Sequence, residues 1–227
     1  GLVAYYPFNG NAKNEMGEEN DGEINGATLG EDRHGSMDGS LIFDGVDDKI
    51  NATDSGDLDG FSECSVVLWV KPGVDLNAET PRQDLLYKGA NQQNGVSWAL
   101  RYGDSSGEFG LDIHGSNWND AITYQYSADF PQGEWFQLAF TYDGNDAQLF
   151  VNGVAVGTVL NNTLSGATFN NSDPLTIGSR SDNEFWFNGI LDDIRIHNRA
   201  LNETEINDLY CEGGWCEQQG LVAYYPF

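Results

Sequence analysis

Basic residues are scarce in this sequence. Its 227 residues include 36 aspartates and glutamates but only 10 lysines and arginines, which gives a formal charge of -26. A surface of that charge repels the phosphates of nucleic acids and the headgroups of anionic membranes. We therefore exclude nucleic acid as a partner and expect divalent cations, or neutral or cationic ligands, instead.

Long apolar runs are also missing. No stretch approaches the ~20 apolar residues that a membrane-spanning helix needs, so we expect no membrane insertion. Neither an initiator methionine nor a basic and apolar secretion signal opens the chain. We interpret the sequence as a fragment of a longer protein whose targeting segment lies elsewhere.

Cysteine is limited to three residues. Cys64 lies in an apolar, strand-like stretch, which indicates a small buried thiol. Cys211 and Cys216 flank two glycines, which would let this short loop close into a disulfide. Two thiols without a neighbouring histidine or a further cysteine are too few for a zinc site. We expect the disulfide, and with it an oxidising compartment, so the predicted location is secreted or at the cell surface.

No catalytic constellation is recognisable. Retaining glycosidases need two carboxylates about 5–5.5 Å apart. The nearest candidates, Glu108 and Asp112, would stand ~13 Å apart along a strand. The three histidines fit no serine or cysteine triad, and no phosphate-binding glycine motif is present. We expect no catalytic residues, and a glycan hydrolase is the least favoured of the functions considered.

The first eight residues recur at the other end of the chain. Gly1–Phe8 returns letter for letter as Gly220–Phe227, an interval of 219 positions. We interpret residues 1–219 as one domain of a tandem array and residues 220–227 as the first strand of the next repeat. Two copies of one strand compete for one place in a sheet. The second copy either stays outside it or fills that place in this or a neighbouring molecule, by strand swapping.

Between these ends, short apolar segments alternate with clusters of glycine, asparagine and aspartate. Residues 135–142 alternate with period two, and the segments 143–146 and 152–153 have the composition of hairpin turns. One helix is predicted over 202–210, with Asn202 as its cap. The predicted strands are 3–7, 40–43, 49–51, 64–71, 83–88, 97–102, 109–114, 122–127, 135–143, 147–152, 175–179 and 191–197. This pattern predicts an all-β fold, a two-sheet antiparallel jelly-roll sandwich with one short C-terminal helix.

Several segments, read together, resemble the laminin-G-like jelly rolls of the concanavalin A-like lectin and glucanase superfamily. They are the opening strand and loop at 2–10, the Phe-Asp-Gly turn within 40–50, the Tyr-Asp-Gly and Val-Asn-Gly landmarks within 135–153, and the closing strand at 187–201. The resemblance spans nearly the whole chain and implies the same sandwich. It implies little about the ligand, because lectins, carbohydrate-binding modules, adhesins and some glycosidases share this fold.

The closing strand suggests a metal site. Strict alternation places Asp192 on one face with Ile190, Ile194 and Ile196, where a carboxylate is costly to bury without a partner. Asp193 and Arg195 would then pair on the other face. A hard cation such as Ca²⁺ is a natural partner for Asp192. The alternative is that Asp192 accepts backbone N–H bonds at a strand end, without a metal.

The family resemblance implies the rest of this calcium site. In related sandwiches a calcium ion joins the loop after the first strand, the Phe-Asp-Gly turn and the closing-strand aspartate. Carried over, its ligands are Asn9, Asp44 or the carbonyl of Gly45, and Asp192. We expect Asp47 and Asp48 to lie in a solvated turn.

Two regions, 87–101 and 179–187, are rich in the groups that a sugar site needs. These groups are aromatic rings for the apolar face of the sugar and amides and carboxylates for its hydroxyls. By resemblance to pentraxin-type relatives, the candidate polar contacts are Asn91, Gln93, Asp182 and Asn183. The candidate aromatic surfaces are Tyr87, Trp98, Trp118 and Trp186, and Arg101 and Arg180 would reach an anionic sugar. The alternative is that the amides are ordinary turn residues and that Trp98 or Trp186 belongs to the core.

Together these observations favour a non-catalytic, calcium-stabilised binding or adhesion module of a repetitive extracellular protein. Its predicted partners are a glycan or glycoconjugate and the neighbouring repeats. The alternative is a structural or self-associating spacer repeat that has no ligand of its own.

Overall fold

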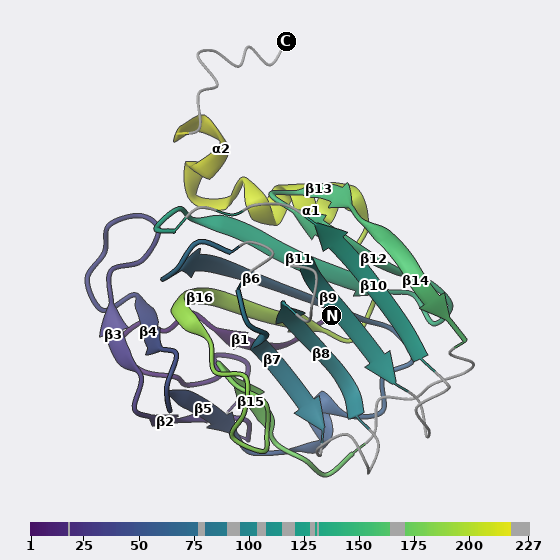
Figure 1. The fold of residues 1–227 in the computed structure, drawn as a ribbon, viewed down its shortest axis with the longest axis horizontal. Helices are drawn as coiled ribbons and strands as arrows, with labels where there is room; N and C mark the ends of the chain where they lie inside the picture. The colour runs from purple at the N-terminus through teal and green to yellow at the C-terminus, as the bar shows by residue number, and fades with distance from the viewer. Residues whose placement is uncertain are drawn as a thin grey trace.

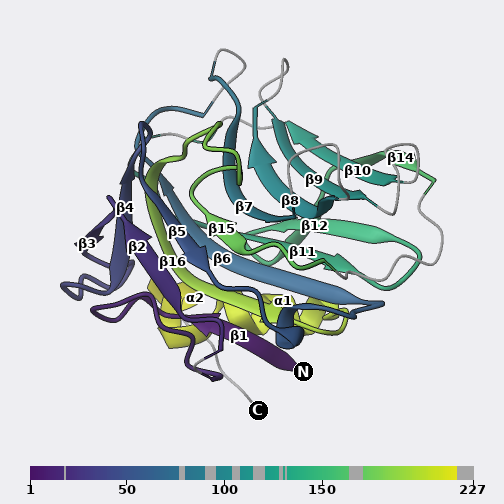
Figure 2. The same ribbon diagram turned by 90° about the horizontal axis from the view of Figure 1, so that it is seen from below.

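The chain folds into two antiparallel β-sheets packed face to face (Figures 1 and 2). The computed structural model describes residues 1–17, 19–76, 80–89, 96–103, 108–114, 121–127, 130, 132–163 and 171–218. Within this part of the chain, the predicted sandwich with a short helix near its C-terminal end is confirmed. The repeated segment 220–227 lies outside the described residues.

The first sheet has the strand order β13-β12-β11-β6-β16-β4-β3, with β1 also paired to β16. Because β6 occupies one side of β16, β4 and β1 share the other side, one after the other. The strands are β1 (Leu2–Tyr6), β3 (Thr28–Gly30), β4 (Ser40–Asp44), β6 (Cys64–Pro72), β11 (Phe136–Tyr142), β12 (Ala147–Val151), β13 (Val154–Val156) and β16 (Asn188–His197).

The second sheet has the order β14-β10-β9-β8-β7-β15-β5-β2. Its strands are β2 (Gly22–Asn25), β5 (Lys49–Ala52), β7 (Gln83–Gly89), β8 (Val96–Tyr102), β9 (Glu108–His114), β10 (Ala121–Ser127), β14 (Thr158–Asn162) and β15 (Leu175–Ile177). Every strand predicted from the sequence is present. The prediction missed the short strands β2, β3, β13 and β14, and β14 is exposed along its whole length, so it carries no alternating apolar signal.

The core lies between the two sheets and follows the predicted alternation. Phe136, Leu138, Phe140 and Tyr142 of β11 all enter it. The opposite face of β11 is also covered, because Ala139 packs in a second apolar cluster with Ile206 of α1 (Glu203–Tyr210). The α1 helix begins with the predicted cap at Asn202, whose side chain accepts the Glu205 N–H.

A bulge interrupts β16 where the sequence predicted strict alternation. The register with β6 shifts between Asp192 and Arg195, and Asp193 has a φ of +50°. Leu191 and Ile194 therefore both face the core. The prediction that Asp192 shares a face with Ile194 is wrong, because the bulge turns Asp192 and Asp193 together onto the outer face of the sheet.

The C-terminal helices cover that outer face (Figure 2). The ring of Trp69 stacks on Tyr210 at 5.7 Å and meets Trp215 edge-on at 4.8 Å. Trp215 begins α2 (Trp215–Gln218), which follows the short 3-10 helix η2 (Glu212–Gly214). Cys211 and Cys216 form a disulfide around this segment, and Cys64 is a buried free thiol.

Candidate ligand-binding cleft

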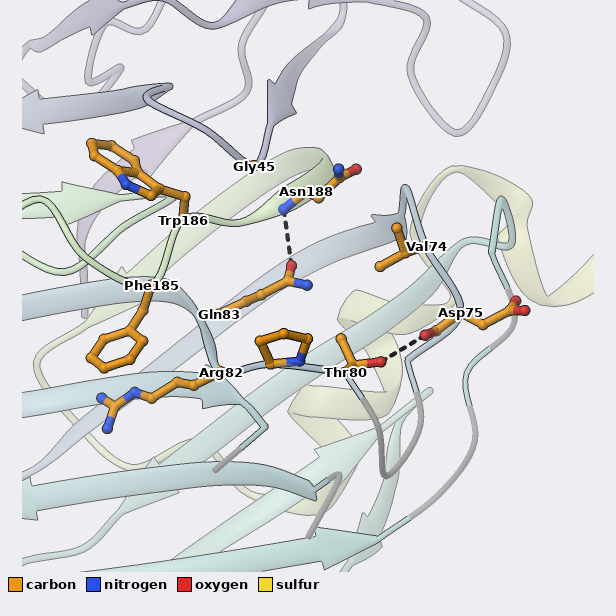
Figure 3. A pocket seen from close by; sticks show the side chains of 10 residues that line it. Gly45, Val74, Asp75, Thr80, Arg82, Gln83, Phe185, Trp186 and Asn188 are labelled. Atoms are coloured by element: carbon orange, nitrogen blue, oxygen red, sulfur yellow. Dashed lines mark hydrogen bonds between the residues drawn. The ribbon is translucent and has the colours of Figure 1, made fainter. Parts of the chain in front are cut away.

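A cleft lies at the end of the sandwich where β7 begins. Three connections meet there: the β4–β5 turn, the segment between β6 and β7, and the segment that leads into β16. Between them is a cavity of about 590 Å³, within the size range of small-ligand sites. Its lining is Gly45, Val74, Asp75, Thr80, Pro81, Arg82, Gln83, Phe185, Trp186 and Asn188 (Figure 3).

Hydrogen bonds between these connections fix the polar groups of the cleft. The Asn188 N–H donates to Oε1 of Gln83 at 2.9 Å, and Nδ2 of Asn188 donates to the carbonyl of Asp44 at 3.1 Å. The Asn188 carbonyl accepts from the N–H of Gly73 at 3.0 Å. At Gly45, with a φ of +80°, a Cβ would stand 2.9 Å from the Asn188 side chain, so the turn requires glycine. These bonds hold the amides of Gln83 and Asn188 in place before any ligand arrives.

Two neighbouring aromatic residues form one wall of the cleft. In Figure 3 the half-buried indole of Trp186 and the ring of Phe185 extend in different directions from neighbouring positions, and the ring of Phe185 points toward Arg82. Phe185 lies between two guanidinium groups, with Arg82 at 4.6 Å and Arg180 at 4.3 Å from its centroid. Its φ of +57° is unusual for a residue with a side chain, and strained backbone of this kind concentrates at binding sites.

The arginines beside the cleft are held by carboxylates. Arg82 makes a bidentate salt bridge with Asp84, with N–O distances of 2.7 and 3.0 Å. Arg180 makes a bidentate salt bridge with Asp182, at 2.7 and 2.8 Å, and also contacts Glu184. Asp84 is fully buried, and burial raises the pKa of its carboxyl although the nearby arginines oppose the shift. The positive charge next to the cleft is therefore already matched by negative charge.

Arg101 lies farther along the second sheet in the same kind of pair. Its guanidinium bonds to Asp112 at 2.6 and 3.3 Å and crosses over Gly110, where a Cβ would stand 2.7 Å from the guanidinium carbon. Its predicted contact with an anionic sugar would have to compete with Asp112. Tyr87 is only 2% exposed and packs against Ala99 on this outer face.

The remaining predicted ligand residues separate into three groups. Trp186 lines the cleft, and Asp182 and Asn183 belong to the connection that carries it. Trp98 is 3% exposed and meets Phe140 edge-on within the core, so it belongs to the core and offers no surface to a ligand. The positions predicted at Asn91, Gln93 and Trp118 lie outside the described residues.

Sequence reasoning did not find most of the cleft. Arg82, Gln83 and Asn188 are among its polar residues, yet 105 positions separate Gln83 from Asn188, which it bonds directly. Only the strand order brings these segments together. The available signal was the aromatic content of Phe185–Phe187 next to a polar segment, and that signal did identify Trp186.

The predicted calcium ligands do not gather in one place. Arg33 bonds to Asp192 at 2.8 Å and to Asp193 at 2.6 Å, so the partner of Asp192 is an arginine of the chain itself. Burial, followed by the charge of Asp193, raises the pKa of Asp192 to about 7. Asp44 pairs with Asn188, four residues before Asp192 along β16 and therefore ~13 Å from it. Asn9 is exposed in the loop after β1.

The β4–β5 turn gathers three carboxylates instead. Oxygens of Asp44, Asp47 and Asp48 lie within 4.8 Å of one another. Asp48, which the sequence placed in a solvated turn, is only 8% exposed and lies over Gly26, where a Cβ would stand 2.1 Å from its Oδ1. It accepts the Asp44 N–H at 2.8 Å, and burial raises the pKa of its carboxyl. This is a set of hard oxygen donors that suits Ca²⁺, and through Gly45 it adjoins the cleft.

The sequence of residues 44–207 matches the family model of the concanavalin A-like lectin/glucanases superfamily. Among curated proteins, the adhesion G-protein coupled receptor V1 of Danio rerio is 25% identical over 98 residues, which are 43% of this chain and 2% of the receptor. The chain thus spans a small fraction of the curated relative that it matches. No helix in the described part of the chain is long and apolar enough to cross a membrane.

Solved structures with the same fold include one domain of an extracellular arabinanase and the binding domains of two toxins. Domain 4 of AbnA, a GH43 extracellular arabinanase from Geobacillus stearothermophilus, in complex with arabinotriose, has a TM-score of 0.66 and 22% identity over 92% of this chain and 98% of that one. The binding domain of Paraclostridial Mosquitocidal Protein 1 has a TM-score of 0.72 and 19% identity, over 92% and 51%. The binding domain of Botulinum Neurotoxin DC with SialylT has a TM-score of 0.67 and 15% identity, over 92% and 50%. At these identities the likeness shows the fold alone.

Proposed function

The chain belongs to the concanavalin A-like lectin/glucanases superfamily, and on that basis we propose that it is a non-catalytic module that binds a glycan in the cleft beside β16. The observation that carries the proposal is the cavity of about 590 Å³, whose lining combines the half-buried aromatic residue Trp186 with the fixed amides of Gln83 and Asn188. An aromatic surface with a few oriented polar groups is the arrangement that sugar sites use.

Two of the solved structures support a carbohydrate as the ligand class. Domain 4 of AbnA holds arabinotriose, and the neurotoxin binding domain holds SialylT. A binding role is also supported by the second sheet, where Asp84 and Asp112 are each committed to an arginine rather than set up as an acid and a base. The predicted disulfide, which the structure contains, supports a secreted or cell-surface location.

The charges around the cleft favour an uncharged glycan. Arg82 and Arg180 each form a bidentate salt bridge with a carboxylate, and the chain as a whole carries a formal charge of -26. An anionic sugar would have to displace a carboxylate and approach against the field of the whole protein. A neutral sugar needs only the hydrogen bonds that the fixed amides and the paired guanidinium groups still offer.

The test is a binding screen followed by one substitution. The protein is screened against neutral and anionic oligosaccharides, and the affinity of the best ligand is measured by isothermal titration calorimetry. Trp186→Ala should weaken binding about tenfold, the effect of losing one aromatic contact of ~1.4 kcal/mol. Trp135→Ala is the matched control, because its half-buried indole lies outside the cleft. Equal binding by the Trp186 variant and the wild type would exclude this cleft as the site.

Calcium at the β4–β5 turn forms a second part of the proposal. Asp44, Asp47 and Asp48 would hold the ion, which would neutralise their mutual repulsion and stiffen the turn. Since Gly45 lines the cleft and Asn188 bonds to the Asp44 carbonyl, a stiffer turn would also fix one wall of the ligand site. Asp192 has no part in this site, because Arg33 is its partner.

The alternative function, a self-associating repeat, has one observation in its favour. Ala4, Tyr6 and Phe8, which carry β1 into the core, are each fully buried, and the segment 220–227 contains the same residues in the same order. It therefore has every side chain needed to replace β1 of a neighbouring repeat or a second molecule. Light scattering after size exclusion tests this alternative: dimers that disappear when residues 220–227 are deleted support it, and a monomer at all concentrations excludes swapping between molecules.

A further inference from the structure

Lys88 is a lysine whose ammonium group is buried at the end of the sandwich opposite the cleft. It lies near the end of β7, two residues after Leu86, which faces the core, and its side chain is only 1% exposed. Removing an ammonium group from water is costly unless protein oxygens replace the lost hydration. The contacts of Lys88 therefore explain why the fold tolerates it.

Five oxygen atoms from two connections surround the ammonium nitrogen. Asp54 contributes a carboxylate oxygen at 2.7 Å and Asp59 one at 3.5 Å, both from the connection between β5 and β6. Asn171 contributes its side-chain and main-chain oxygens at 3.1 and 3.2 Å, and Asp173 its carbonyl at 2.6 Å, from the segment before β15. The ring of oxygens is closed further by the Asn171 N–H, which donates to Asp59 Oδ1 at 3.2 Å.

This oxygen cage differs from an ordinary lysine ion pair in number and in charge. An ammonium group has three protons to donate, yet five oxygens face it. The two carboxylates carry two negative charges against the one positive charge of the lysine. Carboxylates together with amide and main-chain carbonyl oxygens are the ligand set that proteins use for Ca²⁺, which takes six to eight oxygens and carries the matching charge.

We propose that the oxygens of Asp54, Asp59, Asn171 and Asp173 form a cation site of the calcium type, and that the ammonium group of Lys88 fills it in place of a metal ion. The two connections are then joined permanently by a cation that is covalently part of the chain. This end of the sandwich is then independent of calcium, in contrast to the calcium site proposed for the carboxylates of the β4–β5 turn. The inference concerns a different site from the glycan cleft and does not depend on it.

Two substitutions of Lys88 separate loss of the cation from access for a metal. Lys88→Ala removes the ammonium and empties the path of the side chain, so that Ca²⁺ and its waters can enter the cage. Lys88→Met also removes the ammonium, but its thioether chain fills the same path and blocks the metal position. In EGTA both variants should melt about 10 °C below the wild type, because two partly buried carboxylates have lost their cation.

Calcium should then distinguish the two variants. Any calcium response of the wild type is subtracted first. Calcium should then raise the Tm of Lys88→Ala by several degrees and leave the Tm of Lys88→Met unchanged. Titration calorimetry should show one additional calcium ion bound per chain for Lys88→Ala alone. Lys13→Met, at an exposed lysine, is the control for loss of a positive charge. Equal calcium responses in the two Lys88 variants, or none in either, would overturn the proposal.

Hydrogen exchange of the wild type gives a test that needs no variant to fold. Amides of residues 53–59 and 171–173 should be equally protected with calcium and with EGTA, because the lysine holds both segments. Loss of protection in EGTA would show that a metal ion, and not Lys88, joins these connections, and the proposal would fail.

Discussion

Removing the charge of Asp192 should make this protein more stable at neutral and alkaline pH. Burial, with a smaller effect from Asp193, raises the pKa of Asp192 from 3.8 to about 7, although Arg33 acts in the opposite direction. Between these two pH values the folded state keeps a proton that the unfolded chain releases. The stabilisation from this group is therefore complete below about pH 4 and is lost as the pH rises through 7.

The Asp192→Asn variant removes this titration and retains an oxygen that accepts the hydrogen bond from Arg33. A pKa displaced from 3.8 to about 7 corresponds to ~4 kcal/mol of unfolding free energy. The free energy of unfolding of the variant, relative to that of the wild type, should therefore increase by ~3 kcal/mol between about pH 4.5 and about pH 8, the part of this titration that lies in that pH range.

Urea unfolding of both proteins at several pH values measures this difference. Asp208→Asn is the control for loss of one negative charge, because Asp208 is exposed on α1. A difference between the Asp192 variant and the wild type that stays constant with pH would refute the reasoning. It would mean that Arg33 fully compensates both neighbouring carboxylates.

Three further predictions concern single groups. Arg33→Met should lower the unfolding free energy by ~3–5 kcal/mol in urea at neutral pH, because Asp192 and Asp193 lose their shared cation. Burial lowers the pKa of His197 to about 4, so the wild type should lose up to ~3 kcal/mol as the pH falls from 6.5 to 4, and His197→Gln should lose less. In differential scanning calorimetry, EGTA should lower the Tm of the wild type but not that of Asp48→Asn. A wild-type Tm that EGTA leaves unchanged would contradict a calcium site at the β4–β5 turn.

The sequence predicted the fold well wherever the local pattern is produced by burial on one face. The alternation of Phe136, Leu138 and Phe140 needs no tertiary information, because a strand buried on one side always produces it. The cap at Asn202 and the hairpin at Asn152–Gly153 are equally local, and the structure contains both. The resemblance to a family then supplied the layer arrangement that local patterns leave open.

The bulge in β16 is a feature that the local residue pattern does not predict. The alternation of residues around Asp193 does not predict its φ of +50°, which falls between the part of β16 that pairs with β4 and the part that pairs with β1. One displaced residue moved Asp192 from the predicted core face to the outer face. The argument for a buried Asp192 depended on that parity, whereas the distance between Asp44 and Asp192 follows from their positions along β16.

The binding site was predictable only in part for the same reason. Trp186 was identifiable because an aromatic residue in a polar connection is locally unusual. The roles of Gln83 and Asn188, and the cage around Lys88, depend on contacts between segments far apart in the chain. Lys88 in particular has the sequence context of an ordinary strand end, and only the pairing of β15 with β5 and β7 reveals its partners.

The location of the cations has a consequence for how molecules of this protein meet one another. Seven of the ten basic residues are held in ion pairs within the described residues, so few positive charges remain to offset the acidic exterior. The edge strand β14 exposes Val159 and Leu160 and has no lysine of the kind that commonly protects such edges from cross-strand pairing. For this edge, electrostatic repulsion between the negatively charged molecules opposes such pairing instead. Salt screens it beyond ~10 Å at 0.1 M, so ionic strength controls how closely two such edges can approach.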